Sequence, residues 1–200
     1  MKKILALILS FVWVMTCFPT YVFAADHQQD CVNALLTDNT EWNGTTISQP
    51  TTRETIDGVE YYKIYTAEEL AYIAQTGGDW LTYNYILAND IVLNDVELTY
   101  DASGDLTVDA ATLNQWTPIN GFIGIFNGND FSVSGVYVNT TSSAGFFANC
   151  RGDVSNLTVT NSYIKGGSQV GGICGSFNET GKDMTNCYFD GAVVGTSSVE

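Results

Sequence analysis

Short segments with a common pattern recur along the second half of the chain. The sequences VSGVYV, VSNLTV and MTNCYF begin at residues 133, 154 and 184, so that successive copies start 21 and 30 residues apart. A glycine-led signature precedes each copy: GIFN, GFFA and GICG begin at residues 124, 145 and 172. A period of this length, made of short β-type segments bounded by Gly, Asn or Ser, is typical of a β-solenoid and not of a helical repeat. We therefore predict an all-β fold, a right-handed parallel β-helix.

The positions within each copy predict how the copies stack. The fourth and sixth residues are separated by one residue, as one face of a strand requires, so Val136, Leu157 and Cys187 should lie one over another in the interior. The position before them is occupied in the three copies by Gly135, Asn156 and Asn186. Because Gly and Asn tolerate positive φ, we expect a left-handed corner here, with Asn156 and Asn186 stacked on consecutive coils.

The first residues have the composition of an export signal. Lys2 and Lys3 precede an apolar run over residues 4–18, and Ala24 ends a small-residue site suited to cleavage. The run is shorter than the roughly twenty residues that a membrane-spanning helix needs. We predict a signal peptide at residues 1–24, an extracellular or cell-surface protein, and no membrane span after cleavage.

The charge balance excludes two classes of partner. The chain has 22 acidic and 7 basic residues and a net charge of -15, and loss of Lys2 and Lys3 with the signal peptide would bring it to -17. Binding to nucleic acid or to anionic lipid needs clustered Lys or Arg. We therefore expect no nucleic-acid partner and no membrane-surface partner, and we interpret the scattered acids as an aid to solubility.

A short helix and a polar insertion are expected upstream of the repeats. Thr66 and Glu69 fit a capping box, an apolar face follows, and Gly77 and Gly78 end the helix. The β-rich run 83–93 is followed by the insertion 94–115. The expected organisation is a flexible lead-in at 25–40, an N-terminal cap with the first coil at 41–121, and repeats at 122–200.

The motifs resemble a known family. VGGICG at 170–175, MTNCYFDGAVVG at 184–195 and AGFFA at 144–148 are similar to the GLUG motif of bacterial secreted and surface proteins. This motif also occurs in the non-catalytic part of IgA-specific metallopeptidases. The resemblance extends upstream to residue 41 and implies an extracellular β-helix whose N-terminal end is closed by the short helix. Most such proteins have no assigned activity, so the motif indicates architecture more than function.

Few residues suit catalysis. The single histidine, His27, precedes the expected folded part, which excludes Ser-His, Cys-His and HExxH chemistry within that part. Arg151, Asp153 and Lys165 could line a polysaccharide-degrading groove, although an exposed turn with a local ion pair explains them as well. We predict a non-enzymatic protein with no cofactor.

Cysteines and aspartates offer further candidate sites. The four cysteines after the signal peptide permit three disulfide pairings, none forms a CxxC pair, and Cys187 fits a buried small apolar residue. Three acids of the insertion are weaker candidates for binding Ca²⁺, but their spacing matches no EF-hand loop and a solvated acidic loop explains them as well. These acids are Asp101, Asp105 and Asp109.

Outward-facing aromatic residues are the best binding candidates. Tyr137 and Tyr188 occupy the outward position of the same strand in two copies, with Thr158 between them. Such a row could form a flat platform for a sugar ring or a partner protein, although Tyr and Thr are also common strand formers.

These observations lead to a functional prediction. We predict a structural or adhesin-like module that presents a β-helix surface to a host or cell-surface protein or glycan. The alternative is the N-terminal scaffold of a larger secreted enzyme, or a degenerate carbohydrate-active β-helix.

The C-terminal end of the repeats lacks a cover. The last coil would leave strand edges and apolar core open to water, whereas solenoids normally cover that end. We therefore expect an array that is truncated at its C-terminal end, with a longer native chain, an unseen partner or end-to-end self-association.

Overall fold

A computed structural model describes residues 40–196 of the 200-residue chain. The predicted signal peptide, almost all of the predicted lead-in, and Cys31 lie outside the described residues. Fourteen β-strands, one α-helix and two short 3-10 helices are present within them. None of the helices between residues 40 and 196 is both long enough and apolar enough to cross a membrane.

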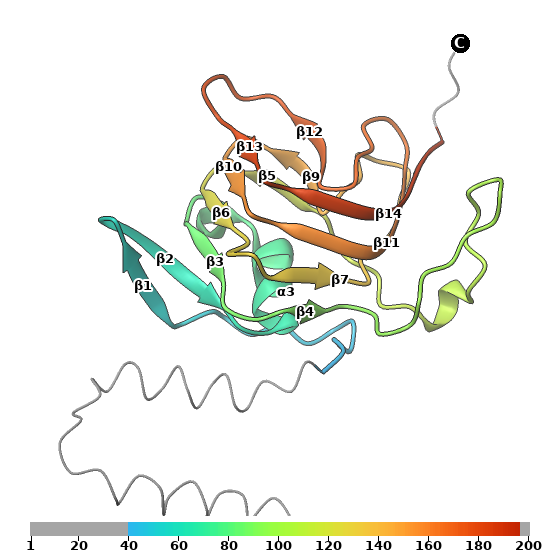
Figure 1. Cartoon of the computed structure of the whole chain (residues 1–200), viewed down its shortest axis with the longest axis horizontal. Helices are drawn as coiled ribbons and strands as arrows, with labels where there is room; N and C mark the ends of the chain where they lie inside the picture. Colours follow the sequence, from blue (N-terminus) through green and yellow to red (C-terminus); the bar gives the residue numbers. More distant parts are fainter. Residues whose placement is uncertain (1–39, 197–200) are drawn as a thin grey trace, which may run out of the picture. The chain divides into compact units, whose positions relative to one another are not determined.

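The strands form three sheets (Figure 1). The first sheet has the order β1 (Arg53–Ile56), β2 (Val59–Ile64), β3 (Tyr85–Leu87), β6 (Ile125–Asn127), β10 (Asp153–Ser155) and β13 (Met184–Thr185). The second has the order β14 (Tyr188–Gly195), β11 (Thr158–Gly166), β7 (Ser132–Ser134) and β4 (Ile91–Val92), with β8 (Tyr137–Asn139) also paired to β11. The third contains β12 (Cys174–Phe177), β9 (Phe147–Cys150) and β5 (Ile119–Phe122).

The predicted right-handed parallel β-helix is wrong as a description of this architecture, although the fold is largely β. The structure contains three separate sheets with mixed pairing, not a single uniform solenoid. Strands β1 and β2 pair antiparallel around Asp57 and Gly58, whose φ angles are 50° and 82°. An Asp-Gly pair with both residues at positive φ closes a tight hairpin, which forces antiparallel pairing at this point.

The predicted register of the first repeat copy is also wrong. Val154 pairs with Met184, as expected, but on its other side it pairs with Phe126 and not with Val133. Val133 pairs instead with Val159. Two six-residue patterns of similar appearance therefore occupy different sheets, and matching them by sequence shifts the alignment.

The predicted interior positions face the core, but not in one column. Val136 and Leu157 are fully buried, and Cys187 packs against the same cluster. The amide of Tyr188 donates to the carbonyl of Leu157 at 2.9 Å, which places Leu157 and Cys187 on neighbouring segments. Val136 lies elsewhere, because its carbonyl accepts from the amide of Tyr163 at 2.9 Å.

The left-handed corner predicted at Asn156 and Asn186 is confirmed. Both residues have φ 52°, and the Nδ2 of Asn186 donates to the Oδ1 of Asn156 at 3.2 Å. Asn156 in turn donates from Nδ2 to the Oδ1 of Asn127 at 3.2 Å, so three amides form a ladder. Gly135 belongs to another corner, because its amide donates to the carbonyl of Thr160 at 3.1 Å.

Helix α3 (Ala67–Thr76) begins and ends where the sequence predicts. The Oγ1 of Thr66 accepts from the amide of Glu69 at 3.3 Å, and Oε2 of Glu69 accepts from the amide of Tyr65 at 2.8 Å. Gly77, with φ 62°, ends the helix. The apolar face of α3, including fully buried Leu70 and Ile73, joins the core, and the helix packs against β2 and β5.

Candidate functional site

The structure separates the three residues of the predicted binding platform. Thr158 and Tyr188 are direct partners on β11 and β14. Tyr137, however, is a partner of Tyr163, farther along β11. Tyr188 is 59% exposed whereas Tyr137 is 5% exposed, so the predicted row of three outward side chains does not form.

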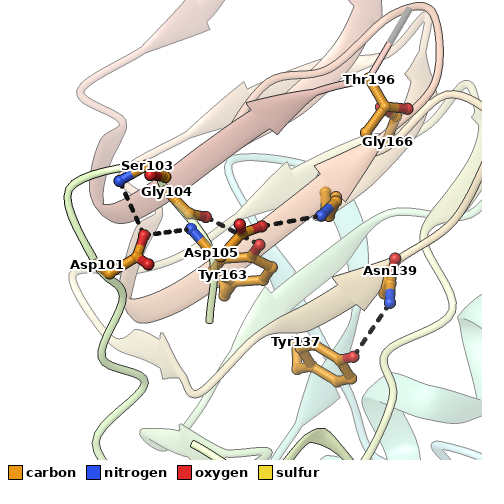
Figure 2. A network of polar contacts seen from close by, with 10 residues as sticks. Asp101, Ser103, Gly104, Asp105, Tyr137, Asn139, Tyr163, Gly166 and Thr196 are labelled. Atoms are coloured by element: carbon orange, nitrogen blue, oxygen red, sulfur yellow. Dashed lines mark hydrogen bonds and ion pairs between the residues drawn. The ribbon is translucent and has the colours of Figure 1, made fainter. Parts of the chain in front are cut away.

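The predicted insertion explains why Tyr137 is buried. Apolar side chains from this loop pack against Tyr137 and Tyr163: Leu98, Leu106, Val108 and Leu113. Figure 2 shows the loop docked over β11, where the hydroxyl of Tyr163 donates to the carbonyl of Gly104 at 3.0 Å. Lys165 adds an ion pair with Asp105 at 3.3 Å. The loop is therefore a packed cover for this sheet, and its polar composition concealed that role.

The weaker Ca²⁺ candidates each bind other groups. The Oδ1 of Asp101 accepts from the amides of Ser103 and Asp105, at 2.8 and 3.0 Å (Figure 2). Asp109 caps the 3-10 helix η2 (Ala110–Thr112) by accepting from the amide of Ala111 at 3.0 Å. No group of three or more His, Cys, Asp or Glu side chains that could hold a metal ion occurs in residues 40–196.

The polar residues considered for a catalytic groove also have separate partners. Arg151 pairs with Glu179 at 2.9 Å, and Asp153 pairs with Lys182 at 2.9 Å. Partial burial tends to raise the pKa of Asp153, but hydrogen bonds from Lys182 and the amide of Asp183 bring it below its ordinary value. Since these partners lie on the following segment, the ion pairs join neighbouring segments of the structure.

A cluster of aromatic side chains, here called the aromatic cluster, is the most distinctive surface feature. Paired strands β2 and β3 supply Tyr62 and Tyr85, and helix α3 supplies Tyr72. The glycine turn after α3 leads into the 3-10 helix η1 (Gly78–Leu81), which places Trp80 and then Tyr83 against them. The Trp80 ring lies 5.3 Å from Tyr62, 5.0 Å from Tyr72 and 5.4 Å from Tyr83, measured between ring centroids.

The aromatic cluster contains both a buried, hydrogen-bonded residue and residues that are accessible to solvent. Tyr85 is fully buried, and its hydroxyl donates to the carbonyl of Trp80 at 2.5 Å. Burial raises the pKa of Tyr85, so this hydroxyl keeps its proton and its hydrogen bond. Tyr83 is 39% exposed and Trp80 is partly exposed. Aromatic surface is therefore presented to solvent on a base that is held in place.

Charged groups lie at the edge of the aromatic cluster. The guanidinium of Arg53 lies 4.4 Å from the centre of the Tyr62 ring and hydrogen-bonds the hydroxyl of Tyr62. It also pairs with Glu60 at 2.9 Å, and both partners of this pair are at least half exposed. This combination of flat apolar rings with adjacent hydrogen-bonding groups is typical of ligand-binding surfaces.

Sequence reasoning missed the aromatic cluster. Residues 61–85 contain seven Tyr or Trp residues, which is a signal in composition. The residues that converge come from a strand, a helix, a 3-10 turn and another strand, so no single periodicity relates them. Their convergence follows from the β2–β3 pairing and from the glycine turn after α3.

Three thiols lie within the described residues and none forms a disulfide there. A hydrogen bond to Cys174, together with burial, raises the pKa of Cys150. The same hydrogen bond lowers the pKa of Cys174 in spite of its partial burial. Burial raises the pKa of Cys187. The Sγ of Cys174 lies 2.8 Å from the carbonyl oxygen of Ser176, and the Sγ of Cys150 lies 3.6 Å from that of Gly152.

We expect Cys174 to be alkylated before Cys150 and Cys187 in the reduced, folded protein. The thiolate is the reacting form, and its fraction at a given pH is larger where the pKa is lower. The rate at Cys174 should reach its plateau at a lower pH than the rate at Cys187. Timed iodoacetamide labelling with peptide mass mapping measures both rates. In urea the three rates should converge, and labelling of Cys150 first would contradict the assignment.

No family model, no curated protein and no solved structure matches this chain.

Proposed function

We propose that this chain is an exported, non-catalytic module that binds glycans through the aromatic cluster. The observation that carries the proposal is the exposed side chain of Tyr83, held against the partly exposed Trp80 in a cluster that also contacts the Arg53–Glu60 ion pair through Tyr62. The N-terminal sequence, with Lys2 and Lys3 before an apolar run, supports the exported location.

A glycan suits this surface for a physical reason. One face of a sugar ring presents C–H groups, which pack on the flat face of an aromatic ring, and its edge presents hydroxyl groups. Charged side chains form the stronger hydrogen bonds to such hydroxyl groups. Glu60 can accept and Arg53 can donate next to the aromatic rings, so both parts of a sugar ring have suitable partners.

The packing of the aromatic cluster also favours binding. Tyr62 and Trp80 are held by ring contacts on more than one side, so little side-chain entropy remains to be lost when a ligand is bound. The negative net charge, -15 for the full sequence, favours neutral or basic glycans over sulfated or uronic acid-rich ones.

We expect Tyr83→Ala to weaken glycan binding about tenfold, which corresponds to about 1.4 kcal/mol. Glycans are first selected with the wild-type protein on a glycan array, and affinities are then measured by calorimetric titration. Tyr100→Ala is the matched control, because Tyr100 is 48% exposed but lies in the insertion. This control should retain wild-type affinity.

Three results would contradict the proposal. The first is the absence of glycan binding by the wild-type protein across the array. The second is an equal loss of affinity in Tyr83→Ala and Tyr100→Ala. The third is the release of new reducing ends from a bound polysaccharide, which would favour a carbohydrate-active enzyme.

A further inference from the structure

The three sheets end on the same side of the structure with unpaired strands. Strand β13 is last in the first sheet, β14 in the second and β12 in the third, and no strand within residues 40–196 follows any of them (Figure 1). Each therefore presents a row of free backbone N–H and C=O groups.

Side chains at this end are less buried than their counterparts one segment earlier. Val154, Leu157 and Val159 are 0% exposed. The corresponding residues of the last segment are only partly buried: Met184, Cys187 and Phe189. Tyr188, Phe177 and Val193 are exposed, at 59%, 36% and 44%. Apolar side chains thus accompany the unpaired strand edges.

The opposite end of the sheets is covered. Helix α3 packs against β5, and the amide of Ile123, next to β5, donates to the carbonyl of Leu81 at 2.8 Å. The edge of β4 is used by Trp42, whose amide donates to the carbonyl of Val92 at 3.0 Å. The edge strand β1 carries the charged residues Arg53 and Glu54, which discourage strand addition.

We propose that the open end formed by β12, β13 and β14 binds a second copy of this chain, giving a closed dimer with two-fold symmetry. A strand edge is complementary to itself when two copies pair antiparallel, which a two-fold axis produces. Head-to-tail stacking is disfavoured, because at the other end β4 and β5 are covered and the edge strand β1 carries charged residues. The contact therefore closes at two copies and does not grow into a fibre.

Charge supports a second copy as the occupant. Two copies of a chain with net charge -15 repel one another over most of their surface. Asp190 is the only charged residue on the three edge strands, and β14 alone spans eight residues. The loop between β12 and β13 adds Glu179, Lys182 and Asp183, of which Glu179 pairs with Arg151 and Lys182 with Asp153. The strand edges of the open end thus let two acidic copies meet with less repulsion than the rest of the chain does. The aromatic cluster is built on β2, β3 and α3, so both clusters stay free in the dimer and could bind a repeating glycan together.

Sedimentation velocity of the chain as secreted by the expression host tests the proposal. We expect a dimer for the wild type, and Val193→Lys should raise the dimer dissociation constant at least tenfold by placing two added charges at the pairing edge. Val96→Lys is the matched control, because Val96 is 43% exposed on the insertion, and it should leave the dissociation constant unchanged. Tyr188→Lys serves as a second edge variant should Val193→Lys fail to fold by circular dichroism.

Other outcomes would overturn the proposal. A wild-type protein that stays monomeric up to about 1 mM has no such dimer. A monomer in which the β14 amides that point away from β11 are protected from hydrogen exchange would show that the chain covers its own edge. Assemblies larger than a dimer, or equal effects of the β14 substitutions and Val96→Lys, would place the contact elsewhere. None of these outcomes bears on glycan binding, which Tyr83→Ala tests separately.

Discussion

Replacing Trp116 with alanine is expected to lower the free energy of unfolding by about 3–5 kcal/mol. Trp116 is 1% exposed and stacks on Phe146 with ring centroids 5.4 Å apart and an interplanar angle of 6°. Trp42 meets its edge at 6.3 Å. Alanine would leave a cavity between these rings, and the surrounding sheets can fill it only in part.

The loss of stability in Trp116→Ala also includes the loss of a hydrogen bond. The Nε1 of Trp116 donates to the carbonyl of Phe146 at 3.1 Å in a buried environment. This carbonyl would lose a partner, which adds to the cost of the cavity. Urea unfolding followed by circular dichroism gives the free energy, and an unchanged m-value would show that the denatured state is not altered.

Trp116→Phe is the matched control for this prediction. It keeps most of the ring surface and removes the indole N–H, so its cost should be less than half that of Trp116→Ala. Equal losses of unfolding free energy for the two substitutions would show that ring packing is not the main contribution of Trp116 to stability. A cost below about 1 kcal/mol for Trp116→Ala would mean that this side chain is not in the core.

Local features of the structure were predictable from the sequence. The capping box of Thr66 and Glu69 involves groups three residues apart, and it forms as expected. The left-handed conformation of Asn156 and Asn186 is a property of single residues in a tight bend. In each case the interactions that determine the local conformation join residues a few positions apart in the sequence, or residues at equivalent positions of adjacent segments.

The pairing of distant segments was not predictable in the same way. Val133 and Val154 begin two similar patterns, yet Val133 pairs with Val159 in one sheet and Val154 with Phe126 in another. A six-residue alternation defines which side chains point inward but not which sheet they join, because every strand with one buried face has the same alternation. The neighbours of a strand are fixed by the corners and loops around it.

The predicted binding platform at Tyr137 failed because the insertion packs over this residue, which the polar composition of the insertion did not indicate. The insertion is polar on average, but its residues Leu98 and Leu113 join the apolar cluster that contains Tyr137 and Tyr163. Their burial removed Tyr137 from the surface. The aromatic cluster was missed for another reason, because Tyr62 and Trp80 are brought together by helix α3 and the glycine turn that lie between them in the sequence.

The two ends of the insertion are expected to be held in place by the side chain of Asn94. This residue is 1% exposed, and its Nδ2 donates to the carbonyls of Asn114 and Gly135 at 2.9 and 2.7 Å. Its Oδ1 accepts from the amide of Asn114 at 2.7 Å. A single side chain thus ties the two ends of the loop to each other and to the neighbouring segment.

Asn94→Ala should lower the free energy of unfolding by about 3 kcal/mol, because one buried and two partly buried backbone groups would lose a partner. The exposed residue Asn120 provides a control, and Asn120→Ala should stay within about 0.5 kcal/mol of the wild type. Limited proteolysis should cut Asn94→Ala first within residues 95–113, because the loop can detach before the sheets unfold. Detachment would also expose Tyr137, so hydrogen exchange on β8 and on the facing part of β11 should increase before exchange elsewhere. The contrary result is an Asn94→Ala variant that is cut at the same rate and sites as the wild type and loses less than about 1 kcal/mol of stability. It would show that the loop is held in place by its packing on Tyr137 and Tyr163 and not by the Asn94 hydrogen bonds.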